Sequence, residues 1–281
     1  ATDLEIGIST WIGAKVDSDG AITIPAKILV DYINTNTDKT ISFLLKEMTL
    51  HFESEHFKAN IKGIEASEFP IIPSVKKEKE IEILKSDFER AISKVIIAAA
   101  LDESRPVLAG IYIYGKESKI KIVATDSYRL AEETINLTNK LAGDVAFIVP
   151  QRTMSEVLRI LPNAPEKIKI FPGENQVEFV LGKTVIVSRL IEGSFPDYNQ
   201  IIPKNSKTVV KVNVPEFSNA IKMASFFARE SANNIKLKFT FPDKLSVIAS
   251  SPHLGDNVSD VKAEVKGDDL EIAFNAKFIL D

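Results

Sequence analysis

The side chains that could do chemistry in this sequence are few, and most stand apart from one another. His51, His56 and His253 are the only histidines, they fall in predicted strand or turn segments without a partner pattern, and there is no cysteine. A Gly-rich phosphate-binding loop and a spacing typical of metal ligands are both missing from the sequence. A surface or half-buried histidine is the favoured interpretation of each. The sequence therefore predicts no catalytic residues, no metal site and no cofactor.

Asp126 is the carboxylate that most invites a catalytic interpretation, because it lies in a short polar break between two apolar runs. Asp and Ser side chains in such a break also bond their own backbone and form tight turns. The equivalent residues in two further copies of the segment are Asp3 and Ser251. A turn carboxylate that caps backbone amides is therefore favoured over a catalytic acid.

These copies are one of three markers that recur about one domain length apart. The first marker reads A-T-D-L-E-I-G-I-S from residue 1, A-T-D-S-Y-R-L-A-E from residue 124 and the degenerate A-S-S-P-H-L-G-D-N from residue 249. The second places Pro25, Pro150 and Asn275 at intervals of 125 residues. The third pairs E-A-S-E-F-P-I-I-P at 65–73 with E-G-S-F-P-D-Y-N-Q-I-I-P at 192–203. A period of this length is that of a whole small domain rather than of a solenoid unit.

The repeat divides the chain into three units. We predict the C-terminal part of a first domain in residues 1–78, a complete second domain in 79–205 and the N-terminal part of a third in 206–281. By the same comparison, the first unit lacks about 44 residues at its front and the third stops inside its second half. Charged or proline-containing stretches at 65–79 and 204–207 are the predicted linkers.

Apolar spacing predicts the elements within each unit. Helices are expected after Pro25, from about residue 86, after Pro150, over 215–229 and at the C-terminal end, with apolar residues at helical spacing. The expected strands are 1–12, 22–24, 40–46, 48–53, 56–62, 81–84, 107–114, 119–124, 129–137, 167–171, 176–181, 184–190, 209–213, 234–241, 244–249, 258–265 and 270–273. A complete unit then holds two helices and about eight strands, which is the α+β class.

Composition places the chain among globular proteins of a reducing compartment. It has 281 residues, 44% of them hydrophobic and 26% charged, and no cysteine. We therefore expect a soluble, cytoplasmic protein without disulfides. None of its apolar runs approaches the roughly 20 residues of a membrane span, so no membrane association is predicted. The net charge of −4 argues against nonspecific coating of nucleic acid but permits a local basic surface.

Cations on the predicted helices are the remaining candidates. Each helix puts its apolar stripe on one side and Lys or Arg elsewhere, and a single helix of this kind normally just has a solvated face. The same polarity repeated in five helices of tandem domains leaves a functional role open beside that interpretation. The cations are Lys27, Arg90, Lys94, Arg152, Arg159, Lys222 and Arg229.

Three longer segments carry a resemblance to a known family. A-T-D-S-Y-R-L-A preceded by R-P-V-L-A-G, then G-S-F-P-D-Y-N-Q-I-I-P, then A-R-E-S-A-N-N-I-K-L-K-F, resemble the bacterial sliding clamp, the beta subunit of DNA polymerase III. The resemblance covers essentially the whole chain. It implies tandem DNA-clamp domains that close head to tail, as a homodimer, into a ring around double-stranded DNA without sequence specificity. It also implies no catalysis of its own, and it implies replicative and other DNA polymerases and an ATP-driven clamp loader as partners.

The resemblance further implies two sets of contact residues. Short apolar peptides from polymerases, the loader and repair proteins would bind a groove between the second and third domains, formed by Leu108, Thr125, Ser127, Tyr128, Arg129, Leu130, Pro196, Gln200 and Ile201. DNA would face Lys27, Arg90, Lys94, Arg105, Arg152, Arg159, Lys222 and Arg229. Family members often have Gly-His at the positions of Ser127 and Tyr128, so the pocket would be reshaped here.

Alternatives remain at this stage. Leu108 and Leu130 are also compatible with an ordinary core. The chain could be a structural or interaction protein that shares only the repeated domain, or an enzyme built on it. The enzyme would need a convergent set of titratable groups, which is not visible in the sequence.

Overall fold

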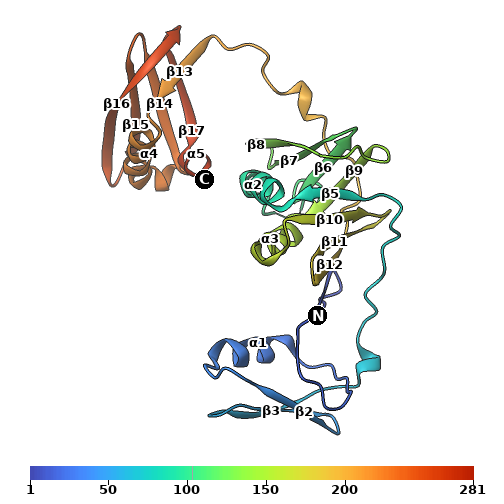
Figure 1. The fold of residues 1–281 in the computed structure, drawn as a ribbon. Helices are drawn as coiled ribbons and strands as arrows, with labels where there is room; N and C mark the ends of the chain where they lie inside the picture. Colours follow the sequence, from blue (N-terminus) through green and yellow to red (C-terminus); the bar gives the residue numbers. More distant parts are fainter. Residues whose placement is uncertain (103) are drawn as a thin grey trace. The chain divides into compact units, whose positions relative to one another are not determined.

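The computed structural model describes residues 1–102 and 104–281, and it separates into two compact units, Ala1–Phe195 and Pro196–Asp281 (Figure 1). The first unit contains the part that the repeat assigns to residues 1–78 together with most of the predicted second domain. The three-domain boundaries at 78 and 205 stay a prediction. None of the described helices is long and apolar enough to cross a membrane.

The first unit has twelve strands and three α-helices among its described residues. The strands are β1 (Ile6–Thr10), β2 (Ser42–Lys46), β3 (Thr49–Glu53), β4 (Lys58–Lys62), β5 (Ile81–Leu84), β6 (Gly110–Lys116), β7 (Lys119–Thr125), β8 (Leu130–Asn136), β9 (Val145–Pro150), β10 (Lys167–Pro172), β11 (Gln176–Leu181) and β12 (Thr184–Arg189). The helices are α1 (Ala26–Thr35), α2 (Lys85–Val95) and α3 (Gln151–Ile160). The predicted second domain thus has two α-helices and eight strands, and the α+β class is confirmed.

Antiparallel sheets organise this unit. One has the order β1-β12-β11-β10-β5, one has β8-β7-β6-β9, and β2-β3-β4 form a small third sheet. Helices α2 and α3 lie side by side (Figure 1) and bury the stripe that the spacing predicts. Phe88 and Ile92 of α2 share one core with Ile111 of β6 and Ile170 of β10. The two helices and two of the sheets are therefore held by a common apolar core.

Strand β1 joins the N-terminal segment to the sheet of the predicted second domain. It pairs antiparallel with β12 from Ile6 opposite Ser188 to Thr10 opposite Thr184. This pairing places the turn before β1 next to the start of α3.

The segment predicted as a linker at 65–79 is mostly exposed but is anchored to the sheet near its end. We call residues 70–77 the strap, because they cross the sheet that contains β10, β11 and β12. Val75 is buried against Phe171 and Val187. The Lys77 Nζ lies 2.8 Å from a carboxylate oxygen of Glu178 and 4.8 Å from the centre of the Phe171 ring. The strap is therefore anchored by both apolar burial and an ion pair.

The second unit repeats the front half of this arrangement. Its elements are β13 (Thr208–Val212), α4 (Val214–Ala228), β14 (Asn234–Thr240), β15 (Lys244–Ser251), β16 (Gly255–Gly267), β17 (Leu270–Asn275) and α5 (Ala276–Leu280). The strands form one sheet in the order β13-β16-β15-β14-β17. Ile221 and Ala224 of α4 pack against Val247 of β15 in its core.

Proline or asparagine of the second marker stands at the N-cap of a helix in all three copies. Pro25 precedes α1, Pro150 precedes α3, and Asn275 precedes α5. The Asn275 side chain accepts a hydrogen bond from the amide of Lys277, which satisfies one of the free amides of that helix end. The repeat therefore marks a structural position.

Several element boundaries differ from the sequence prediction, and the predicted strand 22–24 is only an isolated bridge between Thr23 and Ile64. Strand β6 begins at Gly110 rather than residue 107, because the amide of Leu108 bonds the carbonyl of Arg105 in a preceding turn. Helix α2 begins at Lys85 rather than at 86–87, and the amide of Lys85 donates to the carbonyl of Glu166. The predicted strand 1–12 is reduced to β1, because residues 2–6 form a turn.

Candidate ligand-binding turn and cationic helices

The polar break at 125–130 is a turn closed by its own side chains. The Thr125 hydroxyl donates to the carbonyl of Arg129 at 2.7 Å and accepts from the amide of Ser127 at 3.1 Å. Asp126 Oδ1 accepts from the amides of Tyr128 and Arg129 at 2.8 and 2.9 Å, and its Oδ2 lies 3.2 Å from the Arg129 Nε. The geometry matches the interpretation of Asp126 as a carboxylate that caps backbone amides.

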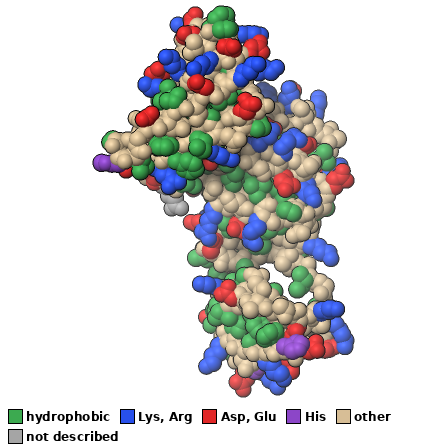
Figure 2. Space-filling view, turned by 90° about the vertical axis from the view of Figure 1, so that its left-hand side faces the viewer, with side chains coloured by type: hydrophobic (Ala, Val, Ile, Leu, Met, Phe, Trp, Pro, Cys, Tyr) green, Lys and Arg blue, Asp and Glu red, His purple; other side chains and the backbone are tan. Residues whose placement is uncertain are grey.

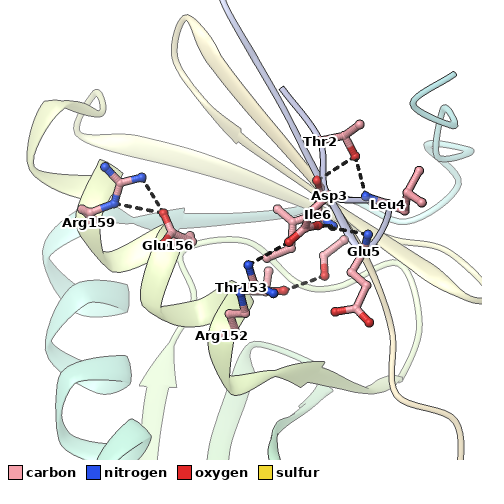
Figure 3. A network of polar contacts seen from close by, with 10 residues as sticks. Thr2, Asp3, Leu4, Glu5, Ile6, Arg152, Thr153, Glu156 and Arg159 are labelled. Carbon is pink, nitrogen blue, oxygen red and sulfur yellow. Dashed lines mark hydrogen bonds and ion pairs between the residues drawn. The ribbon is translucent and has the colours of Figure 1, made fainter. Parts of the chain in front are cut away.

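The turn that begins at Thr2 has the same bonds. The Thr2 hydroxyl donates to the carbonyl of Ile6 at 2.9 Å and accepts from the amide of Leu4 at 3.0 Å. Asp3 Oδ1 accepts from the amides of Glu5 and Ile6 at 3.1 and 2.8 Å (Figure 3). The sequence repeat is therefore a repeat of hydrogen-bond geometry as well.

The residue after the aspartate is left-handed in both turns. Leu4 and Ser127 each have φ of 78°, a conformation that glycine adopts without strain. In the degenerate third copy the Ser251 hydroxyl takes the place of the carboxylate and accepts from the amides of His253 and Leu254 at 3.2 and 3.1 Å. A hydroxyl thus suffices to hold this turn, which argues for a structural role of the aspartates.

The second turn presents a mixed surface. Tyr128 is 83% exposed, Leu130 is half-buried and Leu108 is buried. Arg105 donates from its guanidinium to the Ser127 hydroxyl at 2.9 Å, so this cation lies at the turn. An apolar ligand side chain could cover Leu130 beside the exposed Tyr128 ring.

Three predicted groove residues belong to the second compact unit, and their meeting with the turn stays a prediction. Pro196 and Gln200 are exposed, and Ile201 is 69% exposed. Gln200 donates to a carboxylate oxygen of Asp197 at 2.8 Å. This bond, followed by that from Asn199, holds the pKa of Asp197 below its usual range.

The cations of α2 are partly neutralised by acidic neighbours. Arg90 lies 3.0 Å from a carboxylate oxygen of Asp87 and 3.6 Å from one of Glu133 on β8. The Lys94 Nζ lies 3.1 Å from the same Glu133 oxygen. The local charge on this face is therefore lower than a count of Lys and Arg suggests.

The cations of α3 also have partners. Arg152 reaches Asp3 of the first turn at 2.9 Å, and the Arg159 Nε donates to Glu156 at 2.9 Å (Figure 3). The amide of Ile6 lowers the pKa of Asp3, and the charge of Arg152 adds to the effect. Helical spacing could have revealed Glu156, but Asp3 is remote in sequence and carried no signal.

The remaining predicted DNA-facing residues are more open. Lys27 and Lys222 are exposed, and the guanidinium of Arg229 lies 5.8 Å from the centre of the Phe226 ring. Basic and acidic side chains are interspersed over the face that Figure 2 shows. Such a surface supports weak, screened contacts with phosphates rather than a strong single-sign field.

A cluster of three possible metal ligands was missed by the sequence analysis. One ligand atom each of Asp38, Glu55 and His56 lies within 4.8 Å of the others. The Asp38 carboxylate, however, already accepts from the amide and from Nδ1 of His56, both at 2.8 Å. The His56 side chain lowers the pKa of Asp38 to about 2. We interpret the pair as a latch on the loop between β3 and β4.

Comparison with known proteins matches both parts of the chain to one family. Residues 82–197 match the family model of the DNA polymerase III beta subunit, central domain, and residues 199–281 match that of its C-terminal domain. A beta sliding clamp of Staphylococcus aureus is 31% identical over all of this chain and 77% of the relative.

Solved structures agree with this match. The DNA polymerase III beta subunit of Thermotoga maritima has a TM-score of 0.93 and 28% identity, and the alignment covers all of this chain and 76% of that one. The DNA polymerase sliding clamp of Bacillus subtilis has a TM-score of 0.90 and 27% identity, over 99% of this chain and 76% of that one.

Proposed function

Because this chain belongs to the beta sliding clamp family, the beta subunits of DNA polymerase III, and is a sliding clamp of DNA replication, we propose that its second turn binds partner peptides and that its helices face DNA. Of the three classes that the sequence left open, the clamp is the one that the family assignment supports. The proposed partners are double-stranded DNA, DNA polymerases, the clamp loader and a second copy of the chain.

The observation that carries the peptide proposal is the locked turn at 125–130. Its backbone is held by side-chain hydrogen bonds, so Tyr128 and Leu130 are presented with little backbone-ordering cost on binding. Leu108 supplies a buried apolar neighbour in the preceding turn. A short peptide with an aliphatic anchor is the ligand that this surface fits, and Pro196, Gln200 and Ile201 would complete the groove.

The DNA proposal rests on the helix cations. Lys and Arg contacts with phosphates are independent of sequence and weaken with salt, as a ring that slides requires. The clamp would act by topology, so we propose that it has no catalysis of its own and works in the cytoplasm.

Peptide binding is tested with a fluorescent peptide that carries the apolar anchor of a polymerase tail, titrated into the full chain and into Leu130→Asp. We expect saturable binding that weakens at least tenfold in the variant, because a carboxylate replaces an apolar contact. Val16→Asp is the matched control, since Val16 is 67% exposed in a loop of the same unit. Equal binding by Leu130→Asp and the wild type would exclude the turn as the site.

A further inference from the structure

A pocket lies beside the first turn, entirely within the first compact unit. Its volume is about 170 Å³, and its walls come from the first turn, the strap and the ends of β11 and β12. A cavity of about 150 Å³ with apolar walls is known to accept a benzene-sized group. This pocket therefore has room for one aliphatic or small aromatic side chain.

The pocket stands at the repeat equivalent of the second turn, with one change that lets the strap approach. Gly7 occupies the position that Leu130 holds in the second copy. A Cβ on Gly7 would lie 2.7 Å from Cγ2 of Ile72 in the strap. Gly7 thus allows Ile72 of the strap to pack against this end of the turn. The strap then forms one wall of the pocket.

The rim of the pocket is apolar on one side and carries two charged residues of opposite sign, Arg189 and its neighbour Glu5, on the other. Leu4 is 66% exposed and Ile71 is 92% exposed, although both are large hydrophobic residues. The side chain of Leu4 points away from the polar network of its turn (Figure 3). Gln176 and Arg189 are cross-strand neighbours on β11 and β12 and line the same pocket. Arg189 is exposed, so its guanidinium is accessible to a carboxylate.

We propose that this pocket is a second peptide-binding site, which takes one aliphatic side chain of a linear peptide against Leu4 and Ile71 and a neighbouring carboxylate against Arg189. The inference rests on the proposed function in that the occupant is of the same class as the ligand of the second turn. The second site differs from the site at the second turn in its location and in requiring an acidic residue next to the aliphatic one. The two rigid turns would then give one chain two attachment points for extended segments.

The test is photo-cross-linking of the full chain with acetyl-Gly-Ala-photoleucine-Asp-Ala-Gly-amide, followed by mass spectrometry of the adducts. We expect adducts in residues 2–7 and 70–73. The double variant Leu4→Asn/Ile71→Asp should reduce them at least tenfold, and Val16→Asp should not. Both substituted side chains are exposed, and asparagine tolerates the left-handed backbone at position 4, so the fold should persist. A peptide with Asn in place of Asp should cross-link several-fold less, as should Arg189→Gln with the original peptide.

The two sites are separated by where the adducts fall. Adducts only at residues 105–130 would overturn the second site and leave the proposed function standing. Adducts only at 2–7 and 70–73 would support the second site and contradict the proposed one. Absence of adducts at both places, or adducts at the pocket that survive the double variant, would overturn the inference.

Discussion

At the scale of single residues, the repeated turn depends on one acceptor group. Asp3 and Asp126 each receive two backbone amides, and Ser251 does the same with a hydroxyl. The carboxylate therefore acts on the backbone of its own turn rather than on a substrate. The residue after the aspartate, Leu4 or Ser127, adopts the left-handed backbone conformation, which is unfavourable for a residue other than glycine.

Removing the acceptor of the second turn should destabilise the first unit. In Asp126→Ala the amides of Tyr128 and Arg129 lose their partner, and we expect a loss of about 1–2 kcal/mol in the free energy of unfolding. Asp126→Asn keeps an acceptor oxygen and should lose less than half as much. Urea unfolding measures both, with Asp17→Ala as an exposed control. Equal losses for alanine and asparagine would show that charge, not amide capping, is what matters.

At the scale of elements, segments that look like connections are held by specific contacts. The strap is fixed by Val75 and Lys77, and the loop between β3 and β4 is fixed by the pair of Asp38 and His56. Both contacts join residues that are distant in the chain, so they constrain where a loop can lie. Loops that border a pocket must be fixed in this way if the pocket is to keep its shape.

Breaking the ion pair of the strap should loosen it locally. The side chain of Glu178 is only 9% exposed, so Lys77→Ala leaves a nearly buried carboxylate without its partner. We expect a loss of about 1–2 kcal/mol, reduced by the exposure of Lys77, and faster amide exchange over residues 72–79. Lys76→Ala, at an exposed neighbouring position, should leave exchange unchanged. Unchanged exchange in Lys77→Ala would mean that apolar burial alone holds the strap.

The contact between Asp38 and His56 predicts how the stability of the folded state depends on pH. A carboxyl whose pKa is depressed in the folded state stabilises it above its ordinary pKa, and that contribution disappears as the pH falls through the folded value. For Asp38 the folded value is about 2. Carboxyl NMR should find this midpoint in the wild type and a higher one in His56→Ala. His51→Ala is the control, because its ring contacts Asn60 instead. An unchanged Asp38 midpoint in His56→Ala would show that His56 does not lower the pKa of Asp38.

At the scale of the whole molecule, the proposed contact with DNA depends on how much positive charge the helices carry. Arg90 and Lys94 of α2 both lie close to the carboxylate of Glu133, which partly neutralises their charge. The surface is balanced rather than strongly basic, in line with the net charge of −4. If the chain forms the proposed sliding ring, contacts with phosphates that are individually weak would suit it.

Glu133→Gln should therefore strengthen DNA association. Without this carboxylate, Lys94 loses its ion pair and Arg90 keeps only Asp87, so the slope of log K against log salt should steepen by roughly 1. The expected gain at low salt is several-fold, measured by fluorescence anisotropy with duplex DNA. Glu132→Gln removes a neighbouring carboxylate that pairs with Lys121 and serves as the control. Equal effects of the two substitutions would point to net charge rather than to a DNA-facing α2.

The sequence by itself determined the repeat, the positions of the turns and helices, the α+β class and the family. These features are local or periodic: an apolar stripe at helical spacing, an Ala-Thr-Asp break, a proline at a helix start. The buried face of α2 and the helix starts at Pro25 and Pro150 follow from such patterns and are confirmed.

Only the tertiary structure decided which contacts form between these elements. Arg152 meets Asp3, Lys77 meets Glu178, and Ile72 settles on Gly7 across long stretches of chain. No local pattern encodes such pairs, because they form only when distant segments come together, as when the alignment of β1 with β12 carries Asp3 to the start of α3. The same alignment leaves a pocket at the first turn. The sequence Ala-Thr-Asp alone predicts only a turn there.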